Sequence, residues 1–95
     1  MVVINNKNYE LVTNYRDGFD LESVEKFLTD YFDRFDYVFG DWAYGHLRLK
    51  GFYKSDNKKV SKINDIANLE KYIKDNCAYD CRYFVLEKKE LVKTT

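Results

Sequence analysis

The chain has 95 residues, with 16 Lys and Arg against 16 Asp and Glu, and its formal net charge is zero. This length predicts a single domain over residues 1–95 with one core. No apolar run approaches the ~20 residues that a bilayer-spanning helix needs, which disfavours a membrane protein. With only two Cys and no export signal, we expect a cytoplasmic protein with both thiols free.

The charges are distributed unevenly along the chain. Residues 1–45 hold four basic and nine acidic side chains, a net charge of −5, whereas residues 46–95 hold twelve and seven, a net charge of +5. Two interpretations remain open. The halves either interleave in space and solvate different faces, or they form a polarised surface whose basic side meets a polyanion.

The first third of the chain predicts a hairpin followed by a helix. Residues 1–4 and 9–16 are rich in β-branched and aromatic side chains, and the Asn-Asn-Lys-Asn segment at 5–8 suits a tight turn. After the hairpin, Asp20 can cap a helix over about residues 21–32, where apolar side chains recur at three- and four-residue steps.

The remainder predicts a second hairpin, a second helix and a last strand. The second hairpin has strands over 35–41 and 46–53, joined by the Gly-flanked segment 40–45. A helix that Asn64 or Asp65 can cap follows and ends near residue 76. Residues 82–87 read as the final strand, and residues 88–95 as a frayed charged tail.

These elements predict an α+β fold: a small, mostly antiparallel five-stranded sheet with two helices packed on one face. On that arrangement the other face of the sheet stays partly open. The open face would include His46, Arg48 and Lys50.

A resemblance to a known family is carried by three segments: FDYVFGDWAYGHLRLKGFY at 35–53, CAYDC at 77–81 and YFVL at 83–86. They resemble the YutD-like family of small proteins from low-GC Gram-positive bacteria, and the similarity extends over nearly the whole chain. That family is uncharacterised. The resemblance therefore implies no activity, cofactor or catalytic residue for this chain.

The segment 40–45 admits a structural and a functional interpretation. Glycine lets backbone N–H groups approach a phosphate, but the segment lacks the Lys-Ser/Thr of a phosphate-binding loop. As a hairpin connection, it would pack Trp42 and Tyr44 over the end of the sheet. As a recognition loop, it would present Asp41, Trp42 and Tyr44 to a partner.

The strand after this segment has a basic face. His46, Arg48 and Lys50 alternate with leucines, so they point to the same side of the sheet. Cations beside aromatic rings suit RNA, because cations neutralise phosphates and rings stack on bases. In the alternative, these cations pair across the strands with the acidic residues Glu10, Asp36 or Glu87.

The two cysteines, Cys77 and Cys81, are separated by three residues. Two thiols with the single His46 do not complete a tetrahedral zinc site, and a redox pair usually lies at a helix N-terminus. We therefore expect buried packing residues, no catalytic residue, no metal and no cofactor.

Three functions are compatible with these features of the sequence. The first is a non-catalytic binding module that holds RNA or another polyanion through the basic strand and the aromatic hairpin. The second is an adaptor that binds a bacterial protein through the acidic first helix and the same hairpin. The third is a small thiol-dependent enzyme. The candidate binding residues are Asp41, Trp42, Tyr44, His46, Arg48 and Lys50.

Overall fold

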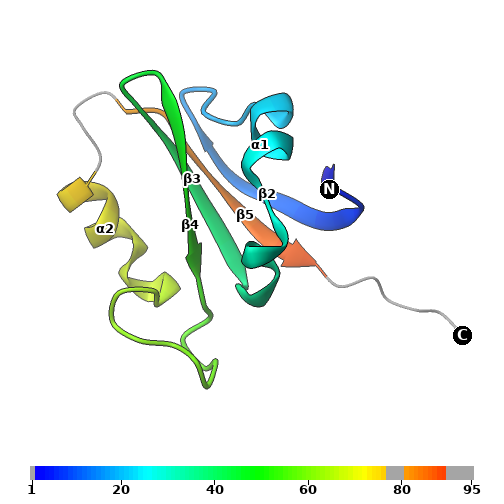
Figure 1. Ribbon diagram of the computed structural model, residues 1–95. Helices are drawn as coiled ribbons and strands as arrows, with labels where there is room; N and C mark the ends of the chain where they lie inside the picture. The colour runs from blue at the N-terminus through cyan, green and yellow to red at the C-terminus, as the bar shows by residue number, and fades with distance from the viewer. Residues whose placement is uncertain (1, 77–80, 90–95) are drawn as a thin grey trace, which may run out of the picture.

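The computed structural model describes residues 2–76 and 81–89, which form one sheet with helices beside it (Figure 1). Each strand is antiparallel to its neighbours, in the order β1-β2-β5-β3-β4. The elements are β1 (Val2–Ile4), β2 (Lys7–Tyr15), α1 (Leu21–Phe27), the 3-10 helix η1 (Asp30–Arg34), β3 (Tyr37–Ala43), β4 (His46–Phe52), the 3-10 helix η2 (Ile66–Asn68), α2 (Leu69–Asn76) and β5 (Tyr83–Lys89). The prediction of an α+β fold with five strands and two helices is confirmed.

The strand that comes last in the chain lies in the middle of the sheet. β5 pairs with β2 on one side and with β3 on the other, so it joins the hairpins β1–β2 and β3–β4. The strands β1 and β4 are left as the two edges. Because β5 extends to Lys89, Lys88 and Lys89 are strand residues and not part of a frayed tail. Residues 90–95 lie outside the described residues. Among those described, no helix is long and apolar enough to cross a bilayer.

Both hairpins turn through pairs of residues in the left-handed region. Asn5 and Asn6 have φ of 52° and 68°, and Tyr44 and Gly45 have φ of 53° and 76°. Such pairs form the two-residue turns that match the twist of antiparallel strands, and Asn and Gly tolerate them best. The Asn-rich turn is as predicted. The second turn is shorter than the predicted segment 40–45, because β3 continues to Ala43.

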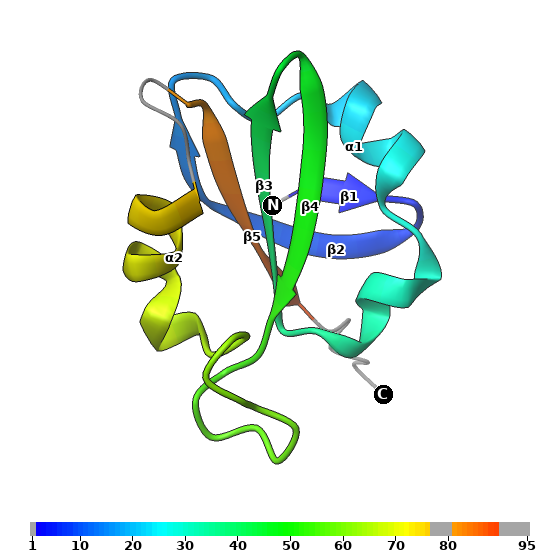
Figure 2. The same ribbon diagram turned by 60° about the vertical axis from the view of Figure 1, so that its left-hand side comes forward.

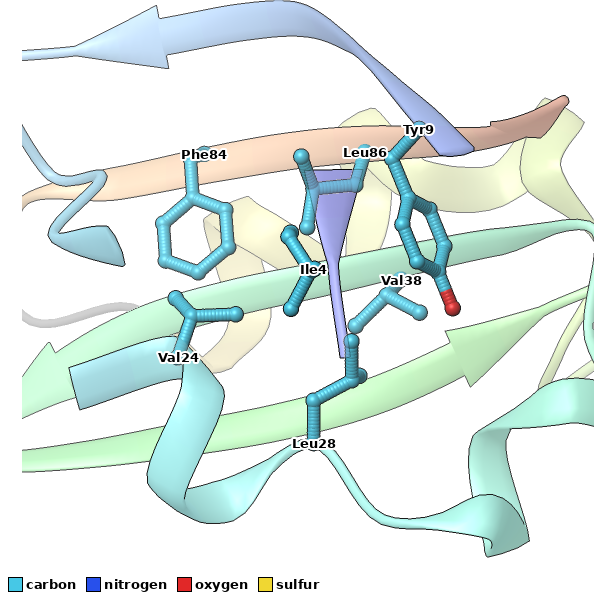
Figure 3. Packing of buried hydrophobic residues seen from close by; sticks show 7 residues of the cluster. All are labelled: Ile4, Tyr9, Val24, Leu28, Val38, Phe84 and Leu86. Carbon is cyan, nitrogen blue, oxygen red and sulfur yellow. The ribbon is translucent and has the colours of Figure 1, made fainter. Parts of the chain in front are cut away.

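The first hydrophobic cluster joins α1 to one face of the sheet (Figure 3). Seven buried residues form it: Ile4, Tyr9, Val24, Leu28, Val38, Phe84 and Leu86. Val24 is contributed by α1 and Leu28 follows it, while the other five side chains come from four different strands. This face of the sheet is therefore closed by the first helix.

Helix α1 ends earlier than the spacing of apolar residues predicts. It stops at Phe27 because Leu28 adopts an extended conformation, with φ −82° and ψ 97°. The Asn5 side chain donates hydrogen bonds to the Glu25 and Leu28 carbonyls, at 3.3 and 2.9 Å, and so satisfies groups at the helix end. The rest of the predicted helix is the separate 3-10 turn η1.

A second cluster lies on the opposite face of the sheet and is closed by α2 (Figure 2). Its buried residues are Phe39, Phe52 and Val85, against which the α2 residues Leu69, Tyr72 and Ile73 pack. The prediction that both helices pack on one face is wrong. Adjacent residues on a strand point to opposite faces, and in β3 and β5 both sets are apolar, so each face requires its own helical layer.

Gly40 lies inside β3, where its lack of a side chain makes room for an aromatic ring. A Cβ atom at this position would overlap the ring of Phe84, which is fully buried on the neighbouring strand. Close packing between strands therefore explains this glycine, and the structure gives it no phosphate-binding loop.

The substitution Gly40→Ala is expected to lower the free energy of unfolding by about 1–3 kcal/mol, because the methyl group overpacks the core. Urea unfolding measures this loss. In a Phe84→Leu background the same substitution should cost less, since the two changes compete for one space. An equal cost in both backgrounds would contradict the assigned contact.

Candidate functional site

The two sides of the sheet carry opposite charge. Residues 17–34, which include α1 and η1, hold six acidic and two basic side chains, a net charge of −4. Residues 46–76, which run from β4 through α2, hold eight basic and four acidic ones, a net charge of +4. Because α1 and α2 pack on opposite faces, this separation along the sequence becomes a separation in space. Of the two interpretations of the charge distribution, the fold therefore favours a polarised surface over interleaved halves.

The basic face of β4 is partly covered, contrary to the expectation of an open sheet. Lys50 is opposite Phe39 in the β3–β4 register, on the face that packs against α2. Its ammonium nitrogen lies 5.3 Å from the centroid of the Phe52 ring and 5.4 Å from that of Tyr72. The lysine stem therefore lies along aromatic surface while its charge faces the gap between β4 and α2.

Arg48 is held by Asp41, which is opposite it on β3. Arg48 Nε donates to Asp41 Oδ1 at 3.1 Å and a terminal guanidinium nitrogen to Oδ2 at 2.6 Å. Asp41 is only 2% exposed. The hydrogen bond with the Asp41 carboxylate raises the pKa of Arg48 above the ordinary value of an arginine side chain. The ion-paired alternative thus applies to Arg48, but its partner is Asp41 and none of the acids proposed from the sequence.

The aromatic residues of the hairpin have different environments. Trp42 lies in β3 and not in a loop, and its indole nitrogen donates to the Gly18 carbonyl at 2.7 Å. The Arg82 guanidinium lies 4.8 Å from the Trp42 ring centroid, so this side chain is part of the fold's packing. Tyr44, at the turn, is fully exposed. His46, the first residue of β4, is also exposed.

Between β4 and α2 lies a hollow of about 660 Å³, named here the β4–α2 groove. Three lysines from three different segments line it: Lys50 on β4, Lys62 before η2 and Lys71 on α2. Its other lining residues are Phe52, Ile63, Asn68, Tyr72, Asp75 and Asn76. Sequence reasoning missed Lys62 and Lys71, because only the packing of α2 brings them beside β4. The sequence feature that could have indicated these two lysines is the net positive charge of residues 46–95.

The segment that carries Lys62 is held by hydrogen bonds around Asp65, which caps the 3-10 turn η2 that leads into α2. The Asp65 carboxylate accepts from the Ser55 hydroxyl at 2.5 Å and from the Ala67 amide at 2.9 Å, and these bonds lower its pKa. On either side of it, the Tyr53 amide donates to the Asn64 carbonyl, and the Tyr53 carbonyl accepts from the amide that follows Asp65. These bonds tie the segment that carries Lys62 to the end of β4.

The described part of the chain contains one of the two cysteines, Cys81, and no cluster of metal-ligating side chains. Within residues 2–76 and 81–89, His, Cys, Asp and Glu form no group of three able to hold a metal ion. Cys81 is disulfide-bonded, so the expectation of a free thiol is wrong for this residue. Cys77 lies outside the described residues.

Comparison with known proteins gives one consistent result. Residues 3–87 match the family described as "Putative antitoxin YutD-like". The chain is 42% identical over 88 residues to a Bacillus subtilis (strain 168) protein named "Putative antitoxin YutD", covering 93% of this chain and 97% of that protein. It is also similar to the solution NMR structure of protein yutD from B. subtilis. There the TM-score is 0.79 at 39% identity, over 99% of this chain and 86% of the other.

Replacing Arg48 should reveal a structural role for the pair with Asp41. Arg48→Met removes two charge-assisted hydrogen bonds from a buried carboxylate and is expected to lower the free energy of unfolding by about 1–3 kcal/mol. The matched control is Lys74→Met on the exposed surface of α2, expected to stay within about 0.5 kcal/mol of the parent. Equal unfolding free energies for the two variants would show that the pair does not stabilise the fold.

Proposed function

The chain belongs to the YutD-like family, and from this membership and the shape of its basic side we propose a non-catalytic binding protein whose β4–α2 groove holds a polyanion, RNA in particular. The observation that carries the proposal is the convergence of Lys50, Lys62 and Lys71 on one groove. Lysines placed along a groove suit a phosphate backbone, because each phosphate they neutralise releases counterions.

The three lysines are not equivalent. Lys62 and Lys71 are exposed, so their ammonium groups are accessible to phosphate. Lys50 is half-buried against the Phe52 and Tyr72 rings, where its position is more restricted. Arg48, which the sequence placed on the same binding surface, is engaged by Asp41. Lys62 and Lys71 therefore provide the sharper test of this function.

The description of the relatives as antitoxins is compatible with a binding role. An antitoxin counteracts a toxin, which binding alone can accomplish. The groove offers three lysines and two aromatic rings beside one carboxylate, Asp75, and this composition favours recognition of an anion over catalysis.

The double charge reversal Lys62→Glu/Lys71→Glu is expected to weaken RNA binding irrespective of RNA sequence. Each lost phosphate contact should lower the slope of log affinity against log salt by about one, so the double variant should lose about two. Fluorescence anisotropy with a labelled RNA at several KCl concentrations measures both quantities.

The matched control for this experiment is an exposed helical lysine on the other face of the sheet. Lys71→Glu alone is compared with Lys26→Glu on α1, since each reverses one exposed charge. Only the former should lower the salt slope. Equal effects of the two variants, or no binding by the parent protein at low salt, would argue against the groove as a polyanion site.

A second candidate function is binding of a protein partner through the tip of the β3–β4 hairpin. Tyr44 is fully exposed there and has φ of 53°, a conformation that is unfavourable for a bulky residue. An exposed aromatic ring kept in such a position suits an anchor for another protein. Trp42 is packed into the fold, so Tyr44 is the residue that tests this function.

For this second function, Tyr44→Asn is expected to abolish capture of one specific bacterial protein, measured by pull-down and mass spectrometry. The fold should persist, since Asn is favoured at this turn position. The control is Val3→Asn, which removes an exposed apolar side chain from the opposite sheet edge. If both variants capture the same proteins as the parent, the hairpin tip is not an anchor.

A further inference from the structure

The geometry around Lys50 points to a single-stranded nucleic acid as the occupant of the basic side, with bases against the apolar and aromatic walls of hollows along β4 and phosphates on the surrounding lysines. This inference rests on the proposed polyanion function and narrows it to one ligand class. It follows from three features: hollows that adjoin one another, exposed apolar walls within them, and cations at their borders.

Two smaller hollows adjoin the β4–α2 groove. One of about 280 Å³ lies over Phe39, Asp41, Arg48, Leu49, Lys50 and Tyr72. Another of about 240 Å³ is lined by Tyr31, Phe32, Phe35, Leu49, Lys50, Gly51, Ile63 and Asn64. Lys50 lines all three hollows, and each smaller one shares a second residue with the groove: Tyr72 in one case and Ile63 in the other. The three hollows are therefore neighbours around the edge strand β4.

The walls of the β4–α2 groove include an apolar side chain that the core does not bury: Ile63, which is 75% exposed. Ile63 lines the same hollow as Lys50, Lys62 and Lys71, where the flat face of a base can pack on it. Apolar and aromatic side chains beside cations are the combination that binds single strands with little sequence preference.

The same features disfavour a double helix. Duplex RNA keeps its bases stacked inside and presents phosphates and hydroxyl groups. These polar groups gain nothing from contact with an apolar wall. A single strand supplies both parts: unstacked bases for the hollows and phosphates for Lys50, Lys62 and Lys71.

The experiment compares three anions with the same protein: an unstructured 12-nucleotide RNA, the duplex of that sequence, and inorganic polyphosphate, which has charge but no bases. The variant is Ile63→Ser, whose exposed position should leave the fold intact, and Val3→Ser is the matched exposed control. Thermal unfolding of each variant verifies folding, and anisotropy or competition titration at low salt measures affinity.

We expect the single strand to bind more tightly than the duplex or polyphosphate. Ile63→Ser should weaken single-strand binding by about fivefold and leave polyphosphate binding unchanged, while Val3→Ser should change neither. If all three anions bind equally and Ile63→Ser alters none of them, the single-strand inference is wrong while polyanion binding stands. If none of the three binds, both are wrong.

Discussion

The structure depends on a pair of central strands that are apolar on both faces. In β5, Phe84 and Leu86 point to one side and Val85 to the other, and all three are buried. A strand of this kind must be covered twice, since either face left in water would lose the stabilisation that burial provides. Helix α1 covers one face and α2 the other. The second helix packs on a cluster contributed by β3, β4 and β5, and the groove lies where it meets the edge strand β4.

This constraint explains which parts of the fold were predictable. The strands, their hairpin pairing and the capping role of Asp65 follow from local periodicity and turn chemistry, which neighbouring residues determine. The placement of α1 and α2 on opposite faces of the sheet does not follow from local sequence. Continuous apolar runs such as residues 37–39 and 83–86 show that a strand is buried, but they do not show that two separate layers bury it. The packing role of Gly40 could not be predicted for a related reason, because the ring that occupies its space, that of Phe84, comes from the far end of the chain.

The candidate site likewise has features that the sequence predicts and features that only the fold determines. The alternation that puts Arg48 and Lys50 on one face is a local property and was visible in the sequence. The partner of Arg48 depends on the register between β3 and β4, which selects Asp41. Lys62 and Lys71 join the site only through tertiary packing of a loop and a helix. A basic strand can thus be recognised from sequence, whereas the surface to which it belongs requires the fold.

Opposite charges on the two sides of a neutral molecule give it an electric dipole across the sheet. The field of a dipole declines with distance faster than that of a net charge, and salt at physiological strength screens charges beyond about 8 Å. Such a molecule is therefore attracted to an anionic surface only at short range. At that range it is turned so that α2 faces the surface and α1 faces away. Orientation, more than overall attraction, then distinguishes a productive encounter from a chance one.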